Sequence, residues 1–229
     1  MTSAMCGAGR SSDKNMHVAL SINARGSGEA RDLLMRARAI VPAGGWVHID
    51  VGDGVYTPQA SWGDALEFAE IAKEMPDINA EVHLMAEDYE DRIVPWLEAG
   101  AKRVIVQADL LRDAEYLMEL GEKYGATMML SVPLHIPASD LVPYFGKFSG
   151  FQILCVTPGN SGQAFQEDAL LKIAAVRAAA PDAILEADGG MTADTARRAK
   201  EAGADILVSS SYVWNNSDPA AAYAALAAI

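Results

Sequence analysis

Short apolar runs rich in β-branched residues alternate with longer amphipathic runs from His17 onward. Apolar residues that fill a run of four to six, or recur at every second position, are typical of strands, whereas spacings of three and four are typical of helices. We predict strands at 17–22, 46–50, 80–84, 103–107, 127–131, 151–156, 183–187 and 206–209. We predict helices at 28–40, 63–73, 89–98, 113–124, 167–179, 192–202 and 219–228, with a weaker helical pattern at 138–145.

This alternation continues without a break in composition, which favours parallel strands connected by helices. Eight such units predict a closed (β/α)8 barrel, the TIM barrel, as a single domain over residues 16–229. An open doubly wound sheet is the alternative. Residues 1–15 are small and polar, contain one arginine, Arg10, and lack the apolar stretch of a secretory signal, so we expect a disordered leader.

The composition limits the partners. Lysine and arginine total 18 against 31 aspartate and glutamate residues, a formal net charge of −13. This charge disfavours nucleic acid and anionic membranes as partners, and no apolar run reaches the length of a membrane span. Cys6 and Cys155 are too far apart for a CxxC pair, which favours a reduced, cytoplasmic setting. Backbone amides rather than a basic patch would have to hold a phosphorylated ligand.

The strand predicted at 46–50 carries ionisable groups on one face. His48 and Asp50 share that face, because side chains alternate along a strand. Burying such groups costs free energy unless they are paired or bind a metal. Active sites of (β/α)8 barrels lie at the carboxyl ends of the strands, and these ends also carry His83 and Asp188.

Two imidazoles and two carboxylates from three strands indicate a site for one divalent cation, formed by His48, Asp50, His83 and Asp188. Nitrogen and oxygen donors suit zinc, iron(II), manganese or cobalt better than calcium. A lone histidine at a strand end is more often a hydrogen-bonding group than a ligand, and we interpret His17 and His135 in that way.

Two glycine-rich stretches follow later strands. Residues 157–163 (TPGNSGQ) follow the sixth predicted strand, and Gly189 and Gly190 precede the helix predicted at 192–202. Glycine lets the backbone approach an anion closely, and amides at the start of a helix carry partial positive charge. Loops after strands seven and eight commonly bind phosphate in this fold. A turn without a ligand is the alternative interpretation of each stretch.

Four motifs resemble, in order and spacing, those of the ribulose-phosphate 3-epimerases: residues 48–54 (HIDVGDG), 82–85 (VHLM), 156–165 (VTPGNSGQAF) and 188–190 (DGG). The resemblance extends from about His17 to the C-terminus. It implies that His48, Asp50, His83 and Asp188 bind the metal and that Asp50 and Asp188 are the acid and base. It also implies a substrate site formed by Ser21, His48 and His83, with phosphate on the amides of Gly159, Asn160, Ser161, Gly162, Gly189, Gly190, Ser210 and Ser211.

The activity implied by this resemblance is that of an isomerase in carbohydrate metabolism, within the pentose phosphate pathway. It would invert carbon 3 of a ketopentose 5-phosphate, converting ribulose 5-phosphate to xylulose 5-phosphate through an enediolate. The alternatives are epimerisation of a ketohexose 6-phosphate, a phosphosugar lyase on the same barrel, and a non-catalytic phosphosugar-binding protein. The lyases place a lysine in an Asp-x-Lys arrangement, whereas this strand has His48-x-Asp50. Such barrels often form homo-oligomers, and the sequence leaves the number of subunits open.

The sequence departs from the family pattern at positions that affect the pocket and the phosphate site. Gly52 and Leu154 stand where the family has methionines that line the pocket. Gln107 replaces a histidine often found in strand four. In the phosphate loops, a Gly-Phe-Gly-Gly segment is here 159–162 (GNSG), and a Gly-Ser pair is Ser210 and Ser211.

Overall fold

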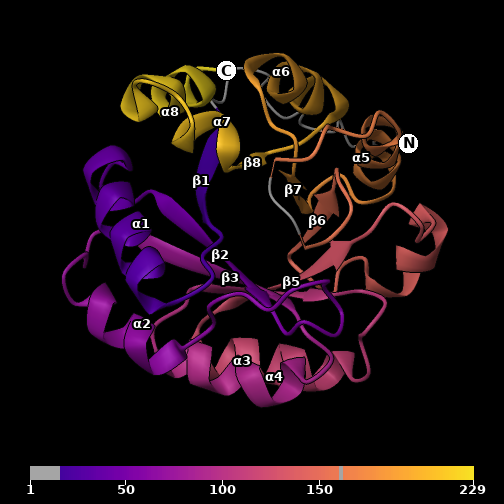
Figure 1. The fold of residues 1–229 in the computed structure, drawn as a ribbon. Coiled ribbons are helices and arrows are strands. Elements are labelled where there is room, and N and C mark those ends of the chain that lie inside the picture. Colours follow the sequence, from indigo (N-terminus) through magenta and orange to yellow (C-terminus); the bar gives the residue numbers. More distant parts are fainter. Residues whose placement is uncertain (1–15, 160–161) are drawn as a thin grey trace, which may run out of the picture.

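The computed structural model describes residues 16–159 and 162–229, in which eight parallel strands close into a barrel in sequence order (Figure 1). The strands are β1 (His17–Ile22), β2 (Trp46–Gly52), β3 (Asn79–Met85), β4 (Arg103–Gln107), β5 (Thr127–Val132), β6 (Gly150–Leu154), β7 (Ile184–Asp188) and β8 (Ile206–Ser209). The helices are α1 (Ser27–Ile40), α2 (Ala65–Ala72), α3 (Tyr89–Glu98), α4 (Ala114–Tyr124), α5 (Asp168–Ala179), α6 (Ala193–Ala202), α7 (Ser211–Trp214) and α8 (Pro219–Ala227).

The predicted (β/α)8 barrel is confirmed, and the open sheet is excluded because β1 pairs with β8. Each predicted strand and each of the seven stronger predicted helices is present, with ends within two residues of the prediction. The weak pattern at 138–145 forms a 3-10 helix, η1 (Ala138–Tyr144), and not an α-helix. Pro143 inside it has no amide hydrogen to donate, which disfavours a regular α-helix. The short helix α7 was not predicted from the sequence.

Capping residues fix the start of several helices at the carboxyl end of the barrel. Asp64, Asp113 and Asp218 each accept a hydrogen bond from the amide three residues later, at 2.9 to 3.0 Å. At α6, Thr192 and Thr195 cap each other's amides. These bonds satisfy helix amides that have no partner within the helix. They therefore order the loops that follow the strands, where the candidate site lies.

The barrel wall separates an apolar layer from a partly polar interior. Val47, Ile49 and Val51 face away from the barrel axis, are fully buried and belong to the main core under the helices. Inside, the amino ends of the strands are closed by a small apolar cluster that includes Ile206, with Trp46 packed against it. The inward-facing positions nearer the carboxyl ends include charged side chains, so the polar chemistry is concentrated at that end.

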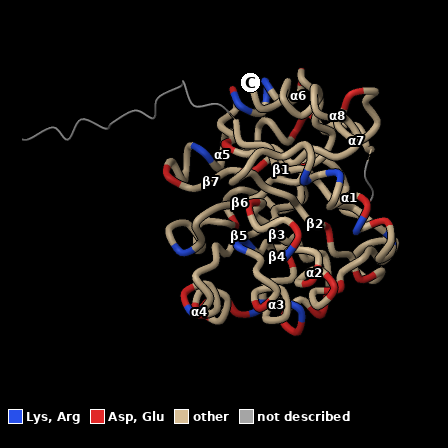
Figure 2. The backbone as a smooth tube through the Cα atoms, turned by 90° about the vertical axis from the view of Figure 1, so that its left-hand side faces the viewer, with Lys and Arg blue, Asp and Glu red and all other residues tan. Residues whose placement is uncertain are grey.

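Charge is spread over the outside of the barrel. Figure 2 shows acidic residues on most of the outer helices and loops, with basic residues between them, in keeping with the net charge of −13. Among the described helices, none is both long and apolar enough to cross a membrane. The leader predicted at 1–15 lies outside the described residues.

Candidate active site

Strand register brings the four predicted metal ligands together. In the parallel pair of β2 and β3, Asp50 lies beside His83. His48 shares the inward face of β2 with Asp50, since the two lie two positions apart and side chains alternate along a strand. Asp188 ends β7, which neighbours neither β2 nor β3, so closure of the barrel is what carries its carboxylate to theirs.

The donor atoms of these residues form one compact group. His48 Nε2 lies 3.2 Å and His83 Nδ1 lies 3.4 Å from Asp50 Oδ1. The same two nitrogens lie 4.0 Å and 3.8 Å from Asp188 Oδ2. All four side chains offer a ligand atom within 4.8 Å of the others. His83 Nδ1 is buried without a hydrogen-bond partner, although it points into this group.

These separations fit one divalent cation. Metal bonds of about 2.1 Å to nitrogen and oxygen place two ligands about 3.0 Å apart at a right angle and about 4.2 Å apart on opposite sides. The four measured separations, from 3.2 to 4.0 Å, fall within that interval. The unpartnered His83 nitrogen also gains a natural role as a ligand, so the residues present suit the metal that the sequence predicts.

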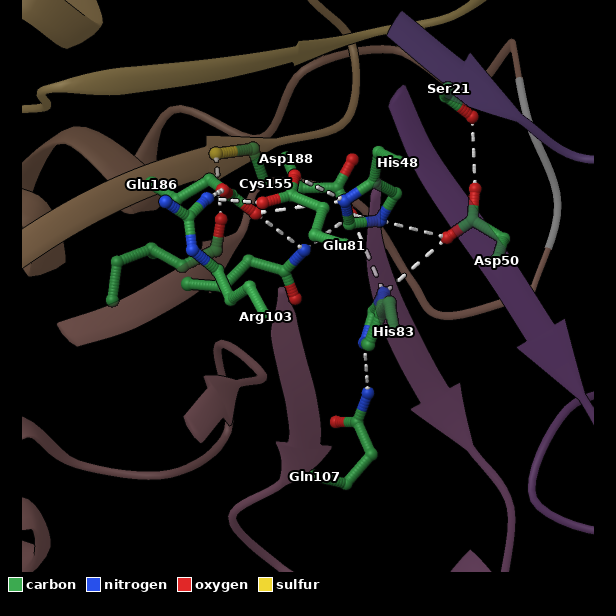
Figure 3. A network of polar contacts seen from close by, with 12 residues as sticks. Ser21, His48, Asp50, Glu81, His83, Arg103, Gln107, Cys155, Glu186 and Asp188 are labelled. Atoms are coloured by element: carbon green, nitrogen blue, oxygen red, sulfur yellow. Dashed lines mark hydrogen bonds and ion pairs between the residues drawn. The ribbon is translucent and has the colours of Figure 1, made fainter. Parts of the chain in front are cut away.

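A second layer of charged residues lies beneath the four ligands (Figure 3). Glu81 Oε1 lies 2.8 Å from His48 Nδ1, and the Arg103 guanidinium donates a hydrogen bond to Glu81 and reaches Glu186 at 3.5 Å. Gln152 Nε2 donates to Glu186 Oε1 at 3.1 Å and to Asp188 Oδ2 at 3.2 Å. This layer therefore orients both His48 and Asp188.

This second layer was not predicted from the sequence, although a signal for it was present. Glu81 precedes His83 by two residues and Glu186 precedes Asp188 by two, so period-two alternation places each carboxylate on the same face as a predicted ligand. His48, Glu81 and Glu186 are themselves close enough to hold a cation. Arg103 already supplies positive charge to both glutamates, so the upper group is the better metal site.

Electrostatics sets the two aspartates apart. Burial favours the neutral form of Asp50, but contacts with His48 and His83 outweigh it and hold the Asp50 pKa well below its usual range. Burial, reinforced by the charges of Asp50 and Glu81, raises the pKa of Asp188 to about 7. Near neutral pH one carboxylate is therefore ionised while the other holds a proton for part of the time, a pattern typical of acid and base pairs.

The imidazoles respond to the same field. Burial alone would lower the pKa of His48, but the carboxylates of Asp50 and Glu81 raise it well above its usual value. Burial lowers the pKa of His83. The carboxylates around His48 thus attract a positive charge, and a proton or a metal cation can supply it.

One cavity at the mouth of the barrel collects most of the predicted site. Its lining includes Ser21, Asp50, His83, Gly159, Gly162, Asp188, Gly189, Gly190, Ser210 and Ser211. Ser21 Oγ donates a hydrogen bond to Asp50 Oδ2 at 2.9 Å. His48 is fully buried and is not part of the lining, so its position suits a metal ligand better than a substrate contact. Asn160 and Ser161 lie outside the described residues.

The two altered pocket positions behave differently. Leu154 lines the cavity, as do Met85 of the 82–85 motif and two residues that were not predicted from the sequence, Asn23 and Met191. Gly52 is not among the described lining residues. A Cβ atom at Gly52 would lie 2.5 Å from Thr57 Oγ1, so the buried Thr57 side chain occupies the space next to this glycine.

Packing alone requires a glycine at position 190. Its φ is +67°, and a Cβ atom there would lie 2.6 Å from the backbone nitrogen of Phe165. The loop after β7 could not approach the loop after β6 so closely with any side chain at this position. This glycine therefore shapes the cavity wall whether or not it also contacts a phosphate.

Comparisons with known proteins show the family of the chain. The model of the ribulose-phosphate 3 epimerase family matches residues 17–214. The ribulose-phosphate 3-epimerase of Mycobacterium leprae is 35% identical over 196 residues, which cover 82% of this chain and 85% of that protein. The Bacillus subtilis protein of the same name is 30% identical over 177 residues, covering 75% and 81%.

Solved structures resemble the fold at lower identity. The 3-hexulose-6-phosphate synthase of Salmonella typhimurium matches with a TM-score of 0.67 and 15% identity, over 93% of this chain and 97% of that chain. At this identity the likeness concerns the barrel alone.

Proposed function

The chain belongs to the ribulose-phosphate 3-epimerase family of isomerases, and from that premise we propose that it inverts carbon 3 of a ketopentose 5-phosphate. The simplest substrate is ribulose 5-phosphate, with xylulose 5-phosphate as product. The observation that carries the proposal is a pair of carboxylates, Asp50 and Asp188, that line one cavity with pKa values moved in opposite directions.

The opposite shifts suggest how the two carboxylates divide the work. Burial would raise the pKa of Asp50, but its contacts with His48 and His83 lower it. Asp50 therefore begins ionised and removes the proton at carbon 3. Asp188, whose pKa burial raises to about 7 in the metal-free site, is assigned as the acid that returns a proton to the opposite face of that carbon. An enediolate lies between the two epimers, and the reverse reaction starts from the opposite protonation states.

Neighbouring side chains keep the two carboxylates in place. Ser21 Oγ holds the Asp50 oxygen that faces away from the imidazoles, at 2.9 Å. Gln152 holds Asp188 at 3.2 Å. Locking both side chains by hydrogen bonds maintains their position relative to the substrate carbon, which proton transfer in either direction requires.

One divalent cation would be held by His48, Asp50, His83 and Asp188, and zinc, iron(II), manganese and cobalt suit these donors. When bound, such a cation supplies a Lewis acid for the negative charge that develops on the substrate oxygens. Glu81, at 2.8 Å from His48 Nδ1, would fix the orientation of that imidazole toward the cation.

The phosphate of the substrate would lie on backbone amides. Gly189, Gly190, Ser210 and Ser211 line the same cavity as the two aspartates, and none of the described lining residues is a lysine or an arginine. The same composition argues against the lyase alternative, whose Asp-x-Lys arrangement needs a lysine in the site. The cytoplasmic location and a homo-oligomer remain predictions from the sequence.

The test is incubation of the purified protein with ribulose 5-phosphate in deuterium oxide. We expect xylulose 5-phosphate labelled with deuterium at carbon 3, and a chelator should abolish the label until a divalent metal is restored. Asp50→Asn and Asp188→Asn should lose turnover while retaining the circular dichroism of the parent. Asp32→Asn, an exposed change on α1, is the control and should remain fully active.

Two outcomes would count against this reading. Absence of both label and product with ribulose 5-phosphate, together with turnover of a ketohexose 6-phosphate under the same conditions, would move the substrate to the second sugar class. Near-parental turnover in either aspartate variant would show that the acid and base lie elsewhere.

A further inference from the structure

His83 lies between the candidate metal site and a buried glutamine. Figure 3 shows its ring with Asp50 on one side and Gln107 on the other. Nδ1 faces the carboxylates at 3.4 Å from Asp50 Oδ1, and Nε2 lies 2.6 Å from the Gln107 amide nitrogen. Both side chains are fully buried, so water cannot substitute for either contact.

Metal binding places a demand on this contact. An imidazole nitrogen binds a cation through its lone pair, so Nδ1 must carry no hydrogen and Nε2 must carry one. Gln107 then has to present its oxygen to Nε2, as an acceptor. If it presents its nitrogen, the ring hydrogen moves to Nδ1 and blocks the metal. Turning the amide by 180° exchanges oxygen and nitrogen without moving other atoms.

Tyr56 discriminates between the two orientations of the amide. Its hydroxyl lies 3.0 Å from the other terminal atom of Gln107 and 3.1 and 3.2 Å from the two carboxylate oxygens of Asp109. A hydroxyl has one hydrogen to donate. If Gln107 turned its oxygen toward Tyr56, two acceptors would compete for that hydrogen. If Gln107 turns its NH2 toward Tyr56, the hydroxyl accepts from the amide and donates to Asp109, and every group is satisfied.

We propose that Tyr56 and Asp109 are positioning residues that fix the Gln107 amide and thereby hold His83 in the tautomer able to bind a divalent cation. The inference rests on the metal site of the proposed function and adds the residues that prepare one of its ligands. Hydrogen bonds then run from Asp109 through Tyr56 and Gln107 to the ring of His83.

The loop after β2 is built to hold the tyrosine there. Asp53 Oδ1 accepts hydrogen bonds from the amides of Val55 and Tyr56, each at 2.8 Å, and Asp53 Oδ2 accepts from the amide of Glu87 at 2.8 Å. Burial and the neighbouring Asp109 raise the pKa of Tyr56 above its usual value, so the hydroxyl keeps the hydrogen that it donates. Asp109 also lies 3.5 Å from the exposed His135.

The experiment compares Tyr56→Phe, Gln107→Glu and the double variant. Zinc affinity is measured by competition with a chromophoric chelator, and ring nitrogen chemical shifts of 15N-histidine report the His83 tautomer in the metal-free protein. Removing a residue that orients a metal ligand typically lowers metal affinity by about 10-fold to 100-fold. For Tyr56→Phe we expect zinc affinity to fall by about 10-fold. Tyr124→Phe makes the same chemical change at a partly buried position of α4 that does not line the cavity and should leave both readouts unchanged.

Gln107→Glu supplies the decisive comparison. A carboxylate can only accept from His83 Nε2, so it holds the required tautomer without help from Tyr56. In that background Tyr56→Phe should therefore cost no zinc affinity. Parental affinity in the single Tyr56→Phe variant would overturn the proposal, and so would an equal loss in both backgrounds, which would indicate only a structural role of the loop.

The nitrogen spectrum separates this inference from the metal proposal. The spectrum is recorded at pH 7.5, above the usual imidazole pKa of about 6.5, so that the tautomer of the neutral ring is read. The parent protein could bind no zinc and still carry the His83 ring hydrogen on Nε2, with that hydrogen absent from Nε2 in Tyr56→Phe. In that case the metal proposal fails while the positioning role stands. A parent with the hydrogen on Nδ1 would overturn the positioning role.

Discussion

Replacing Asp188 by asparagine should make the metal-free protein more stable at pH 8, although it removes a proposed catalytic carboxylate. Asp188 ends β7 inside the barrel, where burial and the charges of Asp50 and Glu81 raise its pKa to about 7. At pH 8 Asp188 is ionised in the folded protein, although burial and the negative charges of Asp50 and Glu81 make that state unfavourable. Asparagine has the same shape without the charge, and its oxygen can still accept the hydrogen bond from Gln152 Nε2.

The size of the effect follows from the pKa. Between its usual value of 3.8 and the folded value of about 7, Asp188 is ionised in the unfolded chain but still protonated in the folded protein. Stability therefore falls as pH rises through this window and levels off above about pH 7. At about 1.4 kcal/mol for each pKa unit, the full loss is about 4 kcal/mol. This value is an upper limit, because 16% of the side chain is exposed.

The assay is urea unfolding at pH 4.5, 6, 7 and 8 in the presence of a chelator. The parent and Asp188→Asn should differ least in unfolding free energy at pH 4.5, and the variant should become progressively more stable than the parent toward pH 8. Zinc at 100 times its dissociation constant should then raise the unfolding free energy of the parent by about 2.7 kcal/mol. The increase should be smaller in the variant, which lacks one ligand.

Parallel pH profiles for the two proteins would refute this reasoning. They would mean that Asp188 titrates at the same pH in the folded and unfolded states, so that neither burial nor its charged neighbours perturb it. A variant less stable than the parent at pH 8 without metal would refute it as well.

Three further predictions concern the fold. Gly190→Ala should lower the free energy of unfolding by about 1 kcal/mol or more beyond the loss in Gly100→Ala. Both glycines have positive φ, but only a Cβ atom at Gly190 would meet neighbouring backbone. Equal losses in the two variants would contradict this reason. Ile49→Ala, at a fully buried position facing the helices, should cost about 2–5 kcal/mol, whereas Leu66→Ala, 80% exposed, should change urea stability little; similar costs would argue against the core assignment. Burial raises the pKa of Cys155, so a thiol reagent should label it only after urea unfolding, and rapid labelling of this thiol in the native protein would contradict its burial.

Much of the candidate site could be predicted because it follows local rules. Alternation along 46–50 placed His48 and Asp50 on one face, and the structure confirms that both point into the barrel. The glycines after the sixth and seventh strands were found from their place between a predicted strand and the following helix, and those that the structure describes line the cavity. Their role toward phosphate stays a prediction.

Other features depended on neighbours that are distant along the chain. Glu81 and Glu186 carried a period-two signal, but their importance came only from Arg103, which lies between them after the barrel closes. The position of Gly52 could not be assessed until Thr57 was seen to fill the adjacent space. The weak helix at 138–145 was misjudged because Pro143 favours the tighter 3-10 form.

The sequence by itself determined the barrel, its order of strands and helices, and the side chains available for chemistry, because periodicity is a property of adjacent residues. Only the tertiary structure decided the chemical state of those side chains. Asp50 and Asp188 are the same residue type at the ends of two strands, yet two imidazoles lower the pKa of the first and burial beside carboxylates raises that of the second to about 7. Charge and burial act through space, so their effect on a side chain is fixed by which other strands the closed barrel places beside it.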